Sequence, residues 1–254
     1  MLEIRHLAAG YGRHEILHKV NLTIPAGAVT VIVGANGCGK STLLKTIAGI
    51  HPPTGGQIHL DGENLRELDA RTLAQRVAYL PQNRQVPAIT TERLVLHGRF
   101  PYLSYPRRYR QEDLDIAHRA MAALGIEDLA DRPLDTLSGG QRQKVYIAMA
   151  LAQDTPVVMM DEPTNFLDIA HQMQMMTQAR FLADSGKTVV LVLHDLSMAL
   201  RCADHLAVMQ DGYILIQGSP EAVFASGCLD AAFGVQVRRT ETDEGWQYYY
   251  KESI

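Results

Sequence analysis

Two glycine-rich segments contain the residues best suited to bind phosphate. The first is Gly34–Ser41 (GANGCGKS), which fits the pattern G-x-x-x-x-G-K-[ST] of a loop that wraps phosphate groups. The second is Leu137–Gln141 (LSGGQ), which stands at the expected start of a helix, where backbone N–H groups bind anions. One nucleotide needs only one phosphate cradle. A chain with two different cradles can lie face to face with a second copy, so that each copy closes the site of the other.

The first segment has the order of elements that a phosphate loop needs. The apolar run Val29–Val33 predicts a buried strand, and a helix is expected from about Lys40 to Ala48. Lys40 would place a positive charge on the β- and γ-phosphates, and the Ser41 hydroxyl is suited to ligate Mg²⁺. The positive end of the helix dipole adds to this attraction. The glycines that let the backbone approach the phosphates are Gly34, Gly37 and Gly39.

Polar side chains also follow other apolar runs that predict parallel strands. Val157–Met160 leads into Asp161 and Glu162, and Thr188–Leu193 leads into His194. Open α/β sheets form their ligand sites at the carboxyl ends of such strands. The alternatives are a helix-capping acidic pair and a histidine that is satisfied within the core. Two adjacent carboxylates at the end of a buried strand would repel each other unless a cation lies between them.

The chain resembles the ATP-binding-cassette (ABC) ATPases, since Leu137–Gln141 is identical to the signature loop of that family. The similarity extends from about Leu2 to about Gly234. It implies an α/β fold: a P-loop NTPase core with a mostly parallel sheet, an antiparallel β subdomain and a helical signature subdomain at about residues 92–151. Residues 1–234 would then form a single ABC ATPase domain. Residues 235–254 would form a C-terminal tail, which we expect to be a β-hairpin.

The resemblance implies a role for each polar residue at these strand ends. Asp161 matches the Walker-B aspartate, which holds Mg²⁺, and Glu162 matches the general base for the attacking water. Gln82 follows the expected strand Val77–Leu80 and matches the Q-loop residue, which reaches Mg²⁺ or the lytic water and senses the membrane partner. His194 matches the histidine that contacts the γ-phosphate. The predicted catalytic residues are Glu162, His194 and Gln82, and the predicted Mg²⁺ ligands are Ser41, Gln82 and Asp161.

The nucleotide itself is expected to contact residues from both glycine-rich segments. Tyr11 matches the family's aromatic residue that stacks on adenine, although a surface tyrosine in a Gly-flanked turn is the alternative. Ser138 and the amides of the two following glycines would bind the γ-phosphate held by the other subunit. The predicted ATP-binding residues are Tyr11, Gly34, Asn36, Gly37, Gly39, Lys40, Ser41, Thr42, Ser138, Gly139, Gly140, Gln141 and Asp161.

Two segments resemble one branch of the family, the ATPases that drive importers of ferric siderophores and cobalamin. Val95–Tyr102 (VLHGRFPY) resembles its Gly-Arg-aromatic-Pro segment. Asp161–Gln172 (DEPTNFLDIAHQ) also resembles this branch, in which a bulky residue precedes Leu-Asp and His-Gln follows; within it, Asn165–Asp168 occupies the position of the family's D-loop. The family more often has Ser or Thr where Asn165 stands. This branch implies two copies of the chain under transmembrane permease subunits, fed by a substrate-binding protein. The expected cargo is a ferric siderophore, with haem, cobalamin and molybdate as alternatives, and the expected location is peripheral, on the cytoplasmic face of the inner membrane.

Composition narrows the remaining classes of function. The chain of 254 residues has a net charge of −4, so it lacks the excess of Lys and Arg that is typical of nucleic-acid-binding proteins. We expect neither a signal peptide at Met1–Leu7 nor a membrane span, because no apolar run approaches the necessary length. A soluble ABC ATPase of DNA repair or translation would need a coiled-coil insertion or a second cassette. A signalling GTPase would leave Leu137–Gln141 unexplained.

Two smaller features allow more than one interpretation. Cys38 lies near Lys40 and a helix N-terminus, which can lower the pKa of a thiol and make it reactive, but a small side chain that fits would serve equally. The arginines of the loop Phe100–Arg110 form either a solvated surface or a contact with anionic lipid or the permease.

Overall fold

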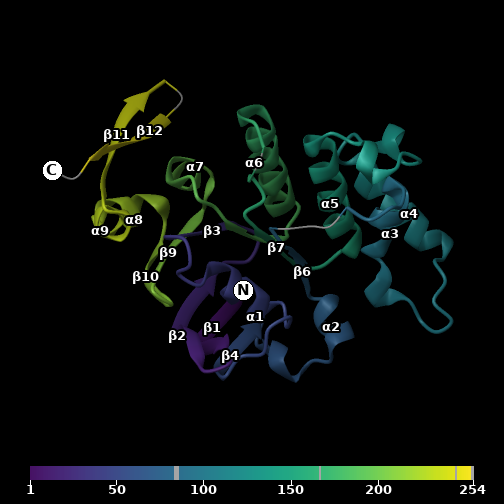
Figure 1. The fold of residues 1–254 in the computed structure, drawn as a ribbon, viewed down its shortest axis with the longest axis horizontal. Coiled ribbons are helices and arrows are strands. Elements are labelled where there is room, and N and C mark those ends of the chain that lie inside the picture. Colours follow the sequence, from purple (N-terminus) through teal and green to yellow (C-terminus); the bar gives the residue numbers. More distant parts are fainter. Residues whose placement is uncertain (83–85, 166, 244, 253–254) are drawn as a thin grey trace.

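The computed structural model describes residues 1–82, 86–165, 167–243 and 245–252, and it has the predicted α/β architecture (Figure 1). The larger sheet has the strand order β10-β9-β3-β8-β7-β6. Its strands run parallel except for β10, which is antiparallel to β9. The strands are β3 (Val29–Val33), β6 (Val77–Leu80), β7 (Val157–Asp161), β8 (Thr188–Val192), β9 (His205–Gln210) and β10 (Tyr213–Gly218).

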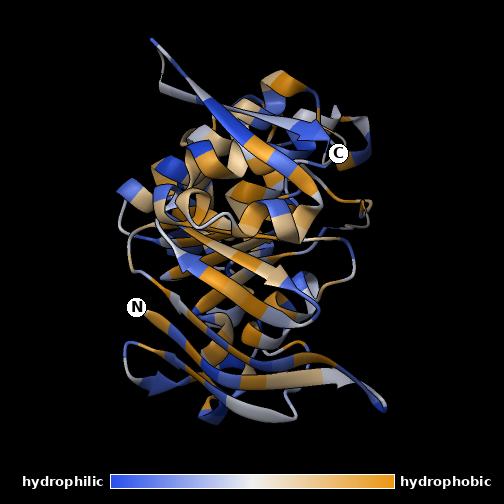
Figure 2. Ribbon diagram, turned by 90° about the vertical axis from the view of Figure 1, so that its left-hand side faces the viewer, coloured by the Kyte–Doolittle hydropathy of each residue, from blue (hydrophilic) through white to orange (hydrophobic). Residues whose placement is uncertain are grey.

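The central strands of this sheet are buried on both faces. Every residue of β3, β7 and β8 is buried, which is why these strands are continuous apolar runs in the sequence. Figure 2 shows apolar segments gathered in the middle of the molecule. The carboxyl ends of β3 and β7 therefore bring the phosphate loop and the two acidic residues to the same edge of the sheet.

A smaller antiparallel sheet, with the order β2-β1-β4-β5, lies beside the larger one. Helix α1 (Lys40–Ile47) contacts β1, β2 and β7, so it is held between the two sheets. Its apolar side chains Leu43, Leu44 and Ile47 are fully buried there. The strands of this sheet are β1 (Leu2–Tyr11), β2 (His14–Ile24), β4 (Gly55–Leu60) and β5 (Glu63–Asn64).

Residues between β6 and β7 are mostly helical. The helices α3 (Thr91–His97) and α4 (Gln111–Ala122) both pack on α5 (Gly139–Gln153), whose side chains Val145 and Ile147 are buried. Helix α4 has Ala123 as its C-cap, and Gly125, two residues further along, adopts a positive φ. Short 3-10 helices lie at Phe100–Tyr102, Glu127–Leu129 and Leu134–Thr136. A further 3-10 helix, Leu65–Glu67, is followed by α2 (Ala70–Ala74), and both come before β6 in the sequence.

The remaining helices lie on the opposite side of the larger sheet from α1 (Figure 1). They are α6 (Ile169–Asp184), α7 (Leu196–Cys202), α8 (Pro220–Ala225) and α9 (Cys228–Phe233). Strands β11 (Val235–Thr242) and β12 (Gly245–Glu252) then form an antiparallel ribbon, which packs on α7. None of the helices in the described ranges is long and apolar enough to cross a bilayer.

Candidate active site

The phosphate loop joins the end of β3 directly to the start of α1. A Cβ atom at Gly34 would lie 2.1 Å from the carbonyl oxygen of Met209, so only glycine fits there. Gly37 adopts φ of 80°, a left-handed conformation that favours glycine. The loop thus depends on both glycines, one for close backbone approach and one for its turn.

Lys40 points back into this loop. Its Nζ donates hydrogen bonds to the carbonyl oxygens of Gly34, at 2.8 Å, and of Ala35, at 2.9 Å, and the residue is only 4% exposed. The first turn of α1 contains no acidic residue that would oppose an anion. A phosphate group can replace these carbonyls as the acceptor while the ammonium group stays in place. Lysine suits this task as a compact point charge.

Asp161 ends β7 beside the start of α1 and is almost fully buried. Its Oδ1 accepts a hydrogen bond from the Ser41 hydroxyl at 3.0 Å, and its Oδ2 accepts one from the Tyr79 hydroxyl at 3.1 Å. Burial raises the pKa of Asp161, whereas the hydrogen bonds from Ser41 and Tyr79 act in the opposite direction. A hydroxyl and a carboxylate oxygen side by side are ligands that suit Mg²⁺. The contribution of Tyr79 was not predicted from the sequence.

Glu162 is the meeting point of the predicted catalytic residues. Its carboxylate accepts hydrogen bonds from the side-chain amides of Gln82 and Asn165, and it pairs with Nε2 of His194. Gln82 and His194 follow different strands, β6 and β8, so the sheet order brings them together. The side chain of His194 is 37% exposed, which argues against a satisfied core histidine. The partners of Glu162 differ from those of Asp161, so the two carboxylates are held separately.

Tyr11 and the phosphate loop line one cavity of about 190 Å³. The Tyr11 ring is half exposed and lies 4.3 Å from the ring of His51, measured between centroids. His51 is itself fixed through Nε2 to the carbonyl oxygen of Gly10 at 2.8 Å. His51 thus supports one side of Tyr11, a contact that the sequence analysis missed. The cavity is lined by Tyr11, Ile16, Asn36, Gly37, Gly39, Lys40, Ser41, Thr42 and Glu162.

The signature segment, Leu137–Gln141, lies outside that cavity. Ser138 is the N-cap of α5: its Oγ accepts from the Gln141 N–H at 3.2 Å, while Oε1 of Gln141 accepts from the Ser138 N–H at 3.0 Å. This capping box fixes the local turn. Ser138 and Gly139 are exposed, and Gly139 faces a second cavity together with Gln82 and Asn165. Within one chain, Gly139 of the signature segment and Lys40 line different cavities.

Cys38 is nearly fully buried, and burial raises the pKa of its thiol, although the neighbouring Lys40 acts in the opposite direction. A buried thiol with a raised pKa is a poor nucleophile. Of the two interpretations of Cys38, the structure therefore favours a small side chain that fits the loop.

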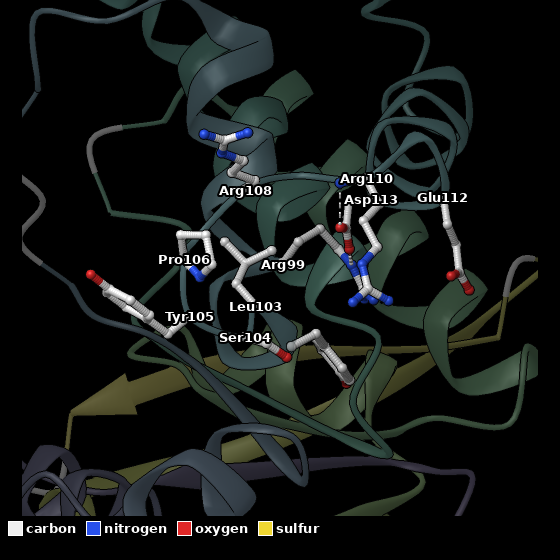
Figure 3. A pocket seen from close by; sticks show the side chains of 10 residues that line it. Arg99, Leu103, Ser104, Tyr105, Pro106, Arg108, Arg110, Glu112 and Asp113 are labelled. Carbon is white, nitrogen blue, oxygen red and sulfur yellow. Dashed lines mark hydrogen bonds and ion pairs between the residues drawn. The ribbon is translucent and has the colours of Figure 1, made fainter.

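The loop at Phe100–Arg110 lines a cavity of about 350 Å³ on the helical region (Figure 3). Arg99 lies in its wall and is buried, with its Nε donating to Asp113 at 3.1 Å and its Nη1 donating to the carbonyl oxygen of Ala152 at 2.9 Å. Arg107, by contrast, lies over the exposed ring of Phe100. Arg99 thus anchors the loop to α4 and α5, while Arg107 belongs to the surface.

The site combines the phosphate loop, the buried Asp161 and the cluster of side chains around Glu162. These features together define a P-loop ATPase. Residues 17–165 match the family model described as ABC transporter. The ferric enterobactin transport ATP-binding protein FepC of Escherichia coli is 41% identical over 232 residues, which cover 91% of this chain and 86% of that protein. The hemin import ATP-binding protein HmuV of Gloeobacter violaceus is 42% identical over 244 residues, covering 93% and 88%.

Solved structures agree with this assignment. A structure described as an inward-facing conformation of a metal-chelate type ABC transporter superposes with a TM-score of 0.85 at 26% identity. That similarity covers 100% of this chain and 97% of the other. The structure of cbiO1 from Clostridium perfringens, part of the ABC transporter complex cbiONQ, gives a TM-score of 0.77 at 28% identity, covering 88% of this chain and 90% of the other. The chain belongs to the ABC transporter ATP-binding family, and the predicted ATP-binding ATPase is thereby confirmed.

Proposed function

We propose that the chain is the ATP-hydrolysing subunit of an importer that takes up a metal chelate, with ferric siderophore as the cargo. The observation that carries the ATPase assignment is the convergence of Gln82, Asn165 and His194 on the Glu162 carboxylate beside the phosphate loop. The cargo is inferred from the relatives, which include a ferric enterobactin transport protein and a petrobactin import protein. Haem is the second candidate, because the hemin import protein is equally similar.

In this proposal the nucleotide occupies the cavity between Tyr11 and α1. The adenine stacks on the exposed face of Tyr11. The phosphates replace the loop carbonyl oxygens as hydrogen-bond acceptors for the Lys40 ammonium group. Mg²⁺ would be held by Ser41 and Asp161, with Gln82 nearby, and would neutralise charge on the phosphates. Asn36 and Thr42 line the same cavity.

Glu162 acts as the general base for the attacking water. The amides of Gln82 and Asn165 both bond to Oε2 and hold the carboxylate in a fixed direction. Glu162 lines the cavity, where its carboxylate can accept a proton from water. His194 reaches the same carboxylate and is sufficiently exposed to contact the γ-phosphate as well. These side chains therefore orient the water and the base before the reaction begins.

A second copy of the chain completes the site. Ser138, Gly139 and Gly140 of one copy would bind the γ-phosphate that Lys40 of the other copy holds, with Gln141 supporting Ser138 through the capping box. The exposure of Ser138 and Gly139 supports this proposal, because a second copy of the chain can reach both residues. Residues 1–234 form the ABC ATPase domain in this proposal, with the helical signature subdomain at residues 92–151.

The proposed partners are transmembrane permease subunits and, through them, a substrate-binding protein. The chain would sit peripherally on the cytoplasmic face of the cell membrane. The proposal is tested by measuring ATP and GTP turnover by the purified chain and by co-purifying its permease. Reconstitution of the complex in vesicles, with ferric siderophore and haem compared as cargo, then identifies the substrate. Transport of neither compound would contradict the proposed cargo.

A further inference from the structure

The first turn of α5 rests against a histidine from the first turn of α6. A Cβ atom at Gly140 would lie 2.1 Å from Cδ2 and 2.2 Å from Nε2 of His171, well inside the 3.0 Å that real Cβ atoms keep. At the neighbouring Gly139, a Cβ atom would meet nothing within 4 Å. Neither glycine has a positive φ. The need for glycine at position 140 therefore comes from the ring of His171 and not from the backbone conformation.

The ring of His171 is held in this place by Asp168. Asp168 is the N-cap of α6, and its Oδ1 accepts hydrogen bonds from the His171 N–H at 2.9 Å and from ring Nδ1 at 2.7 Å. These two bonds lower the pKa of Asp168 and favour its charged form. The edge of an imidazole opposite Nδ1 is the bond between Cδ2 and Nε2. That edge faces Gly140, so the ring cannot turn away without losing its bond to Asp168.

The next turn of α5 is attached to the same region. Nε2 of Gln143 donates to the carbonyl oxygen of Pro163 at 3.0 Å and lies 3.7 Å from Sδ of Met175. Pro163 directly follows the proposed general base, Glu162. One face of α5, through Gly140 and Gln143, is therefore connected to the chain between Glu162 and α6.

We propose that His171 is a positioning residue for the signature segment. Its ring sets the spacing between α5 and α6, and this spacing directs Ser138 and the amides of Gly139 and Gly140 toward the nucleotide of the second copy. This inference rests on the proposed function for the role of the signature segment. It adds that Asp168, His171 and Gly140 of one chain move as a unit, so that a shift of the turn before α6 tilts the signature segment.

The contact is tested by thermal unfolding of the full chain without nucleotide. Gly140→Ala should lower the Tm by about 1–4 °C, because the partly exposed His171 ring must give up its bond to Asp168 to make room for the methyl group. Combined with His171→Ala, the same change should lower the Tm no further, because the space is then open and Ala favours helix over Gly. Gly139→Ala is the matched control and should not lower the Tm in either background. An equal loss from Gly140→Ala in both backgrounds would overturn the proposal.

ATP hydrolysis tests the positioning role. His171→Ala alone should reduce kcat with little change in KM, because the nucleotide is held mainly by the phosphate loop of its own chain. The double variant with His171→Ala and Gly140→Ala should hydrolyse ATP about tenfold faster than Gly140→Ala alone. A factor of this size is the coupling expected between two residues in contact. His171→Asn keeps an amide donor for Asp168 but has no ring. It should rescue Gly140→Ala as well, which identifies the bulk of the ring as the cause.

The outcomes separate this inference from the proposed function. A double variant with restored Tm but no restored hydrolysis would mean that the phosphate itself requires Gly140, which overturns the positioning role. A wild-type chain without any ATP hydrolysis would overturn the proposed function, while the Tm comparison would still decide whether His171 constrains Gly140.

Discussion

The two proposed phosphate cradles of this chain are built in opposite ways. The two ends of the phosphate loop are buried among core elements, while Ala35–Gly37 between them are exposed. Its Lys40 is buried and bonded to carbonyl oxygens of its own loop. The signature segment is exposed at Ser138 and Gly139 and is fixed by a capping box and by the ring of His171. The first cradle is therefore shaped by one chain alone. The second is presented outward, as expected of a surface that acts on another molecule.

Lys40→Ala should give the largest effect, since it removes the charge at the centre of the first cradle. ATP binding should weaken and hydrolysis should fall by about 10²–10³ or more, because phosphoryl transfer depends on electrostatic stabilisation. Steady-state hydrolysis and nucleotide binding on the folded variant measure this. Turnover at the wild-type rate would contradict the assignment of the phosphate loop.

Glu162→Gln should separate the two cradles. The amide is nearly isosteric, so ATP should still bind, but it cannot accept a proton from water, and hydrolysis should fall by about 10²–10⁴. Because ATP would remain between two chains, gel filtration with Mg-ATP should show a dimer. Adding Ser138→Arg should return it to a monomer by placing bulk against the γ-phosphate.

A Glu162→Gln chain that binds ATP yet stays monomeric at high protein concentration would count against shared sites in the isolated chain. The same measurement on the complex with its permease then shows whether the partner is needed for dimerisation. The matched control is Ser138→Arg alone, which should bind ATP as wild type does while failing to dimerise.

Asp161→Asn should reveal how much burying the charge of Asp161 reduces the stability of the fold. Burial raises the pKa of Asp161 above its unfolded value, so the stability it contributes is present at low pH and is lost as the pH rises through the folded pKa. At neutral pH, without Mg²⁺ or nucleotide, Asn should therefore raise the Tm relative to wild type. The difference should shrink as the pH falls toward 3.8, the value expected for the unfolded chain. A lower Tm for the variant at every pH would show that the hydrogen bonds from Ser41 and Tyr79 to Asp161 stabilise the fold by more than the burial of its charge costs.

The sequence predicts the local elements of both cradles better than the contacts between distant segments. The strands Val29–Val33 and Val77–Leu80 coincide with β3 and β6, because buried parallel strands leave a continuous apolar run. The phosphate-loop pattern further predicts the start of α1 at Lys40. These features are local in sequence and therefore visible in it.

Contacts between distant segments leave no such pattern. The hydrogen bond from Tyr79 to Asp161 and the packing of His51 on Tyr11 depend on which elements the fold brings together. His171 follows the D-loop in the sequence, and nothing in that position indicates contact with Gly140. The effect of burial on the Cys38 pKa likewise depends on the surrounding core, which is why proximity to Lys40 alone suggests the opposite shift.

The smallest expected effect concerns the cap of the exposed cradle. Ser138→Ala removes the side chain that accepts from the Gln141 N–H, and loss of an N-cap costs about 1 kcal/mol, or about 2–4 °C in Tm for a chain of this length. Ser138→Asp is the informative counterpart, because aspartate caps helices as well as serine does and should preserve the Tm. Its negative charge would nevertheless repel the γ-phosphate of the second copy, so hydrolysis should be lost while ATP binding to the chain's own phosphate loop is retained. Full hydrolysis by Ser138→Asp would mean that Ser138 only caps α5, and the exposed cradle would then have no part in catalysis.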